Sequence, residues 1–297
     1  MLYTLPFTSY PIKGAEVPCP VCGSAESEVI ATKDRRLKRL PHVKCTDCGM
    51  VRHQFMPSEA ELGEYYRSQY RADYQQADGG PSERHVAKRH VEVDLRLPRI
   101  MAHLPKGARL ADFGCGSGEF VERSIAEGLD AQGFEPGSDY ATYAKEKQGL
   151  PVQNCGWQDF AIDGPVDVVT TFHVFEHLLD PMAAVAAVSG WLKDDGFFYI
   201  EVPNAKNGLE LKGYGSLHMA HTLGFSRYTL ELLGALNGFK VVEVFDEYDI
   251  GIIFQKGTPR AIEDIKADAA AEFAPFDKST VHARFWSYTF GKLRKKG

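Results

Sequence analysis

The stretch Arg109-Leu110-Ala111-Asp112-Phe113-Gly114-Cys115-Gly116-Ser117-Gly118-Glu119-Phe120 decides the fold of this chain. It begins as an apolar strand, passes through glycines at alternate positions and ends in a helical pattern that Gly128 can stop. A strand, a tight glycine turn and a helix N-terminus together form a cradle in which the backbone approaches a ligand closely. Free N–H groups and the helix dipole suit such a cradle to an anionic group.

Two carboxylates near this turn indicate which ligand it takes. The spacing of Gly114, Gly116 and Gly118 differs from the Gly-x-Gly-x-x-Gly of dinucleotide-binding turns. Asp112 can meet an ammonium group, and S-adenosylmethionine (SAM) carries both an ammonium and a carboxylate. Glu135 lies about twenty residues after the turn, where such folds place the carboxylate that accepts ribose hydroxyls. An ordinary glycine turn without a ligand is the alternative.

These paired motifs resemble those of the class I SAM-dependent methyltransferases. The resemblance implies an α/β fold with a Rossmann-like seven-stranded sheet, whose closing antiparallel hairpin is expected at 240–245 and 250–254. It implies that SAM is held by Asp112, Gly114, Gly116, Gly118, Glu135, Pro136, Trp157 and His173. For Trp157, stacking on the adenine and packing in the core are both open.

Composition limits the class of protein. With 297 residues and 44% hydrophobic content, the chain fits one large or two modest globular domains. The net charge of −6 gives nonspecific nucleic-acid binding no general electrostatic support, so nucleic acid is not an expected partner. Without a signal-peptide pattern or a membrane-spanning window, we expect a soluble cytoplasmic protein that does not insert into membranes. A homo-oligomer is left open.

Four cysteines in residues 1–55 predict a zinc ribbon. Two similar Cys-x-x-Cys-Gly knuckles can each place two thiolates on one side of a tight turn, and four thiolates fill a tetrahedral structural Zn²⁺ site. The expected ligands are Cys19, Cys22, Cys45 and Cys48. The basic run Lys33–Arg39 between the knuckles contacts phosphate or, on the simpler interpretation, is a solvated loop.

Residues 56–105 read as a helical connector. Ser58 is placed to cap a helix, and Tyr66, Tyr70 and Tyr74 recur at four-residue intervals on one face. Such a stripe packs in a core or forms a lid whose hydroxyls, Tyr70 among them, reach SAM or the acceptor. Residues 106–256 are then the SAM-binding catalytic domain, and 257–297 are a helical tail with aromatic residues.

Two segments of the catalytic domain supply candidate catalytic residues. Glu176 and His177 follow a buried strand, at the sheet edge where open α/β folds bind ligands. A hydroxyl nucleophile benefits from a base, and histidine has a suitable pKa. His177 is therefore a candidate base, or alternatively only a hydrogen-bonding residue of its loop. A second segment brings His218 and His221 into a glycine-rich loop that can fold over the acceptor.

The zinc lobe, the connector and the His-x-x-x-Phe-Ser run from His221 resemble sugar methyltransferases, including C-methyltransferases of nucleotide-linked ketodeoxysugars. There the matching run is His-Glu-His-x-x-x-Phe-Ser. His221 corresponds to its base, whereas Met219 and Ala220 replace the first two residues. These relatives also carry a further large C-terminal domain that we do not expect here. Both departures favour O-methylation.

Three functions remain open on these grounds. The first is SAM-dependent methylation of a sugar hydroxyl, in a nucleotide-linked sugar, a glycan or a polysaccharide precursor, with histidine as base and Glu176, His177 and His221 as catalytic residues. The second transfers the methyl group to a ketosugar carbon. The third is a non-catalytic SAM-binding protein with the ribbon as a docking module.

Overall fold

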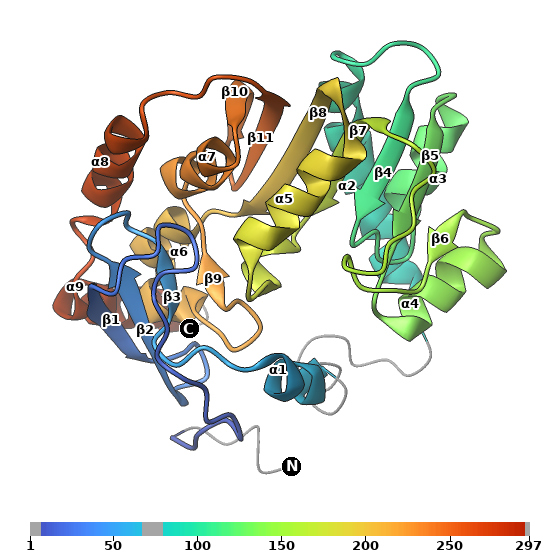
Figure 1. Cartoon of the computed structure of the whole chain (residues 1–297). Helices are drawn as coiled ribbons and strands as arrows, with labels where there is room; N and C mark the ends of the chain where they lie inside the picture. The colour runs from blue at the N-terminus through green and yellow to red at the C-terminus, as the bar shows by residue number, and fades with distance from the viewer. Residues whose placement is uncertain (1–6, 67–79, 295–297) are drawn as a thin grey trace.

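The computed structural model, which describes residues 7–66 and 80–294, is organised around a seven-stranded sheet (Figure 1). The strand order is β10-β11-β8-β7-β4-β5-β6, and β11 alone runs against its neighbours. The predicted Rossmann-like sheet with a closing antiparallel hairpin is confirmed. Its strands are β4 (Arg109–Phe113), β5 (Asp130–Phe134), β6 (Val152–Gln153), β7 (Val166–Phe172), β8 (Leu192–Pro203), β10 (Phe239–Asp246) and β11 (Asp249–Lys256).

Helices cover both faces of this sheet because alternate strand residues point to opposite sides. Within β4, Ala111 and Phe113 join one hydrophobic cluster, and Leu110 joins the other. The first cluster is covered by α5 (Pro181–Trp191) and α7 (Arg227–Leu236). The second is covered by α2 (Glu83–Met101), α3 (Glu119–Ala126) and α4 (Ser138–Thr142), which continues as a π-helix over Tyr143–Lys147. None of the described helices has the length and apolar character needed to cross a bilayer.

Local capping explains where several helices begin. The Asp180 carboxylate accepts from the Ala183 amide at 2.9 Å, directly before Pro181 in the first helical position. Ser226 caps α7 in the same way. At α1 (Glu59–Tyr65), Ser58 and Glu61 form a reciprocal capping box.

A second sheet links the N-terminal lobe to the catalytic part. Its order is β1-β2-β3-β9, and the N-terminal lobe provides β1 (Ser27–Lys33), β2 (Arg39–Cys45) and β3 (Val51–His53). The fourth strand, β9 (Leu223–Gly224), comes from far along the chain and pairs with β3. The lobe and the catalytic part therefore share a sheet, which the sequence did not predict.

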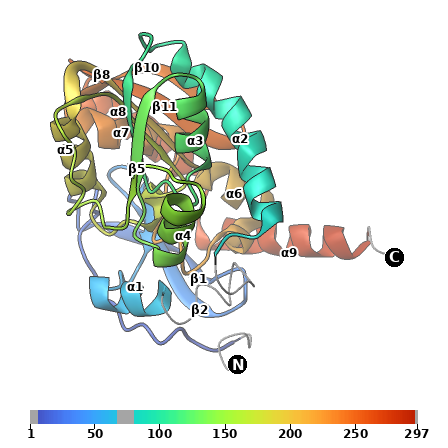
Figure 2. The same cartoon turned by 90° about the vertical axis from the view of Figure 1, so that its right-hand side faces the viewer.

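The tail forms α8 (Ile262–Phe273) and α9 (Lys278–Arg294). Figure 2 shows α9 extending away from the rest of the molecule. It contacts α6 (Ala205–Lys212) and the 3₁₀ turn Gly213–Ser216, where the Phe285 ring stacks on Tyr214 with centroids 3.8 Å apart.

Candidate functional site

The glycine turn after β4 has a conformation that side chains disfavour. Gly114, Gly116 and Gly118 have φ values of 72°, 56° and 90°. A Cβ on Gly114 would approach Val174 to 2.6 Å, so this turn is in close contact with the segment that follows β7. A Cβ on Gly116 would meet nothing nearer than 3.9 Å. No side chain caps the N-terminus of α3, whose N-cap residue is Gly118. The turn thus has room for a ligand against the backbone.

Glu135, at the end of β5, lies against this turn. Its carboxylate accepts hydrogen bonds from the amides of Gly116 at 3.1 Å and Gly137 at 2.7 Å. Burial raises the pKa of Glu135 despite these bonds. The structure therefore brings together the two motifs predicted to hold SAM.

The other predicted SAM residues lie in different environments. Asp112 is buried and accepts from the Thr170 hydroxyl at 2.7 Å, and burial raises its pKa to about 7. Pro136 is exposed next to Glu135. Trp157 is half-buried and packs against the hydrophobic cluster on the α5 side, as its alternative core role would require.

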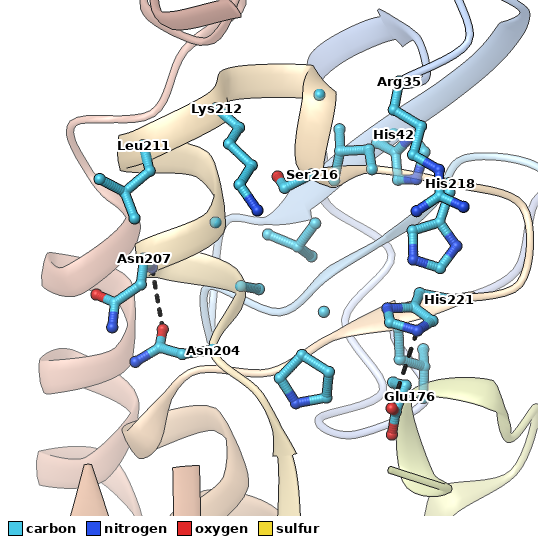
Figure 3. A pocket seen from close by; sticks show the side chains of 18 of the residues that line it. Arg35, His42, Glu176, Asn204, Asn207, Leu211, Lys212, Ser216, His218 and His221 are labelled. Carbon is cyan, nitrogen blue, oxygen red and sulfur yellow. Dashed lines mark hydrogen bonds and ion pairs between the residues drawn. The ribbon is translucent and has the colours of Figure 1, made fainter. Parts of the chain in front are cut away.

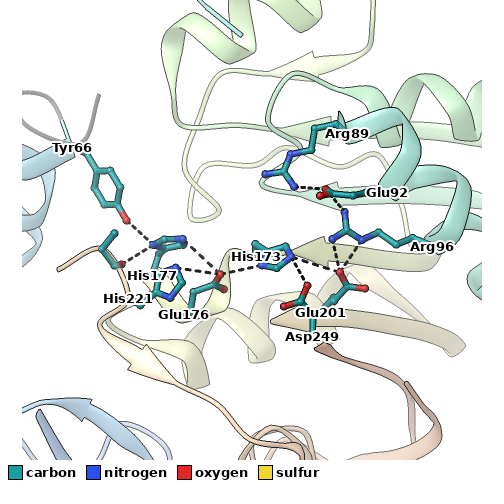
Figure 4. A network of polar contacts seen from close by, with 11 residues as sticks. Tyr66, Arg89, Glu92, Arg96, His173, Glu176, His177, Glu201, His221 and Asp249 are labelled. Carbon is teal, nitrogen blue, oxygen red and sulfur yellow. Dashed lines mark hydrogen bonds and ion pairs between the residues drawn. The ribbon is translucent and has the colours of Figure 1, made fainter. Parts of the chain in front are cut away.

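Glu176 is the centre of a histidine cluster formed by His173, His177 and His221. It lies in the 3₁₀ turn Phe175–His177, is 2% exposed, and neither carboxylate oxygen has a hydrogen-bond partner among the described residues. Its Oε1 atom is 3.6 Å from His173 Nδ1, 3.8 Å from His177 Nε2 and 3.9 Å from His221 Nε2. One carboxylate thus faces three imidazoles (Figure 4).

The surroundings of His177 fix its tautomer. Nδ1 lies 2.7 Å from the carbonyl oxygen of Ala220 and 2.9 Å from the hydroxyl of Tyr66. A carbonyl oxygen only accepts, so we assign the proton of the neutral ring to Nδ1. The lone pair is then on Nε2, on the side of Glu176.

His221 and His218 come from the predicted loop between the 3₁₀ turn Gly213–Ser216 and β9. Their ring centroids are 3.8 Å apart, and those of His221 and His177 are 4.9 Å apart. Burial, together with nearby positive groups, lowers the pKa of both His218 and His221 well below the usual value. Both rings are therefore neutral near pH 7. Tyr70, the other predicted acceptor residue, lies outside the described residues.

His173 has a different setting from its neighbours. It has a left-handed backbone, with φ at 57°, and its Nε2 is 3.5 Å from Asp249 and 3.7 Å from Glu201. Burial lowers the pKa of His173, but Asp249 and Glu176 outweigh that effect and raise it to about 9. The ring is therefore charged near neutral pH.

A buried ion pair continues this network toward α2. Arg96 donates from Nε to Glu201 at 2.8 Å, and the Tyr199 hydroxyl donates to the same carboxylate at 2.8 Å. Sequence reasoning missed Glu201, Asp249 and Arg96 as parts of the site. An acid inside the apolar strand Phe197–Val202 was a usable signal for Glu201, whereas nothing local marked the other two.

The four predicted metal ligands converge in the N-terminal lobe. All four Sγ atoms lie within 4.8 Å of one another. Cys19 and Cys48 are 3.7 Å apart, and Cys22 and Cys45 are 3.5 Å apart. Tetrahedral zinc with Zn–S bonds of about 2.3 Å requires sulfurs about 3.8 Å apart. This geometry is compatible with a zinc ribbon.

Two features define a class I SAM-dependent methyltransferase domain. The seven-stranded sheet ends in the antiparallel hairpin β10–β11, and the glycine turn after β4 is hydrogen-bonded to Glu135. A family model described as a methyltransferase domain matches residues 85–244, and the chain therefore belongs to that family.

Relatives of known name agree on the class but differ in their reactions. The chain is 24% identical over 266 residues to the C-methyltransferase NovU of Streptomyces niveus, covering 88% of this chain and 61% of NovU. It is 32% identical over 123 residues to a ubiquinone biosynthesis O-methyltransferase of Methylococcus capsulatus, covering 39% of this chain and 52% of that protein. The chain thus spans only about half to three fifths of these relatives.

Solved structures share the fold. Magnesium protoporphyrin IX methyltransferase from Synechocystis, with bound S-adenosylhomocysteine, matches with a TM-score of 0.53 at 16% identity, covering 67% of this chain and 100% of that one. The 1,6-didemethyltoxoflavin-N1-methyltransferase of Burkholderia thailandensis matches with a TM-score of 0.52 at 16% identity, covering 70% and 96%. At this identity the likeness concerns the fold alone.

Proposed function

We propose that this chain methylates a sugar hydroxyl with SAM as donor and His177 as general base. The arrangement of His177 carries the proposal. The Ala220 carbonyl holds the proton on Nδ1, which leaves Nε2 to take a proton from a hydroxyl. Glu176, 3.8 Å away, stabilises the imidazolium that results. A base of this kind contributes about 10²–10⁴-fold to the rate.

The residues around the glycine turn fit the donor. Gly116 leaves space at the backbone, the α3 N-terminus suits the SAM carboxylate, and Glu135 is placed for the ribose. SAM supplies an already activated methyl group. The protein therefore mainly orients the acceptor, holds its proton at His177 Nε2 and uses neutral His221 as a hydrogen-bonding partner.

The identity of the two residues before His221 favours O-methylation. Met219 and Ala220 stand where the C-methyltransferases carry a histidine and a glutamate. Both are buried, in a cluster with Leu62 and Tyr65 of α1. Neither offers an acid or a base, and only the Ala220 carbonyl serves the site. The second candidate, C-methylation of a ketosugar, is supported by the similarity to NovU along 88% of the chain.

Product analysis tests this function. The chain is incubated with SAM and a panel of nucleotide-linked sugars, free sugars and ketosugars, and products are examined by mass spectrometry and NMR. A methyl ether supports the proposal, and a new C–CH₃ group supports the second candidate. SAM binding by calorimetry without any product across the panel supports the non-catalytic alternative.

Two histidine variants test the assignment of the base. His177→Ala should lower turnover by about 10²–10⁴-fold and leave the SAM dissociation constant within about twofold. His282→Ala, in the exposed α9 face, is the matched control and should behave as wild type. If His221→Ala abolishes turnover while His177→Ala does not, the base is His221.

The proposal includes one structural Zn²⁺ held by the four cysteines. The sulfur distances support this assignment, and four protein ligands leave no open position for catalysis. Metal analysis of purified protein gives the direct measurement.

A further inference from the structure

A cavity of about 220 Å³ opens beside the histidine cluster (Figure 3). Its walls come from the N-terminal lobe, from α6 with the following 3₁₀ turn, and from the loop that carries His218 and His221. It therefore borders Glu176 and His221 and extends toward the zinc lobe. Three cationic side chains line it: Arg35, Arg52 and Lys212.

Arg52, on β3, is a buried cation that lacks a counter-ion. It is 4% exposed, and its Nη1 donates to the carbonyl of His53 at 3.0 Å. Its Nε atom has no hydrogen-bond partner, and no carboxylate of the described residues is within ion-pair distance. A buried charge is costly unless it is paired, so this guanidinium indicates an anion that the protein itself does not supply.

His42, on β2, offers a complementary group in the same cavity. It is 2% exposed, and its Nδ1 lies 2.9 Å from the Leu40 carbonyl, which assigns the proton to Nδ1. Nε2 is then an acceptor, and it is buried without a partner. Burial and the neighbouring His53 lower its pKa well below the usual value, so the ring stays neutral. A ligand hydroxyl is the group that satisfies this nitrogen.

The cationic and the acidic side chains line different parts of the cavity. Figure 3 shows Lys212 and Arg35 on different sides of the cavity, both away from Glu176. Lys212 forms no ion pair with any described residue, and the charge of Arg35 contributes to the lowered pKa values of His218 and His221. The two lining carboxylates, Glu176 and Asp249, both face His173. Arg52 and Lys212 are thus left without a carboxylate partner among the described residues.

We infer that Arg52 and Lys212 bind a phosphate group of the acceptor, with His42 accepting from an adjacent hydroxyl, so that the substrate is a phosphorylated sugar. This rests on the proposed function. A phosphate bound by these two cations places the sugar in the rest of the cavity, which Glu176 and His221 also line. The same chemistry belongs to a sugar monophosphate and to a nucleoside-diphosphate sugar, which the test distinguishes. The N-terminal lobe then has a direct role in substrate binding through Arg52 and His42.

Calorimetry on the full chain tests the subsite with three probes: inorganic phosphate, glucose 1-phosphate and uridine diphosphate. Arg52→Gln and Lys212→Gln should each weaken binding by at least about tenfold, because each removes a charge-assisted contact. Lys206→Gln is the matched control, since Lys206 is on the same helix but pairs with Glu210 at 3.1 Å. Binding to wild type should also weaken as salt rises.

The outcomes separate this inference from the proposed function. Preference for uridine diphosphate over glucose 1-phosphate identifies the nucleotide-linked class, and the reverse identifies the monophosphate. The proposed phosphate subsite is contradicted if none of the three probes binds the wild-type protein at millimolar concentration. It is also contradicted if Lys212→Gln and a folded Arg52→Gln both bind the probes as tightly as wild type does. Should Arg52→Gln fail to fold, Lys212→Gln decides alone. Probe binding that depends on these residues, without methylation of any sugar hydroxyl, keeps the subsite and removes the proposed function.

Discussion

The hydroxyl oxygen of Tyr66 lies 2.9 Å from Nδ1 of His177, which connects the segment after α1 to the proposed base. Tyr66→Phe removes this contact but keeps the ring and the Ala220 carbonyl that fixes the tautomer. We expect turnover to fall about three- to tenfold, since one hydrogen bond is worth about 1 kcal/mol. SAM affinity should be unchanged, as calorimetry can check.

The control for this variant is Tyr228→Phe on α7, away from the histidine cluster. Turnover of Tyr66→Phe equal to that of wild type would show that Ala220 alone orients His177. A large loss of SAM affinity would place Tyr66 at the donor instead.

The charge on His173 predicts a pH dependence of stability. The folded-state pKa is about 9, against 6.5 for an unperturbed histidine, because Asp249 and Glu176 outweigh burial. The stabilisation is therefore complete below pH 6.5 and disappears as the pH rises through 9. His173→Asn tolerates the left-handed backbone and lacks this titration. In urea denaturation, the free energy of unfolding of wild type should fall by up to about 3 kcal/mol relative to that of the variant as the pH rises over that range. A constant difference would contradict the assignment.

The ion pair between Arg96 and Glu201 is buried, with side-chain exposures of 9% and 7%. Arg96→Leu leaves a buried carboxylate without its main partner and should lower the free energy of unfolding by about 3–5 kcal/mol. Arg123→Leu is the control: its side chain is 48% exposed in a surface pair, so about 0–1 kcal/mol is expected. Chemical denaturation measures both. The double variant Arg96→Leu/Glu201→Leu should recover part of the lost free energy of unfolding. If Arg96→Leu destabilises the protein no more than Arg123→Leu does, the buried ion pair does not have the stabilising role assigned to it.

The cysteine cluster predicts one zinc ion per chain. Cys45→Ser should reduce zinc content below about one-tenth and lower the melting temperature by about 5–10 °C, the shift expected for a few kcal/mol in a chain of this size. Cys155→Ser is the control, because Cys155 lies outside the cysteine cluster, and it should keep the zinc content and the melting temperature of wild type. Emission spectrometry and thermal unfolding provide the measurements. Full zinc content in Cys45→Ser would exclude that residue as a ligand.

Features set by local chemistry were predictable from the sequence. The glycine turn and the caps at Asp180 and Ser226 follow from residues close together in the chain. The convergence of the cysteines follows from two similar Cys-x-x-Cys pairs. The loop histidines were also found, because they follow recognisable motifs. Their functional roles remain proposals.

Contacts between segments far apart in the chain could not be predicted from the sequence, and the reason is physical. The two residues of β9 have no period of their own, and only pairing with Arg52 and Val51 makes them a strand. Asp249 and Arg96 meet His173 and Glu201 only after β11 and α2 pack around β8. Nothing in their sequence neighbours indicates such contacts.

The pairing of β9 with β3 restricts how this protein can be recombined with its relatives. Leu223 follows His221 by two residues and is in register with Arg52. A chimera that exchanges only the first 55 residues would pair a foreign β3 with the native β9, which follows the loop of His218 and His221. Domain grafts should therefore carry residues 218–225 together with the donor's N-terminal lobe, so that the two segments change as one unit.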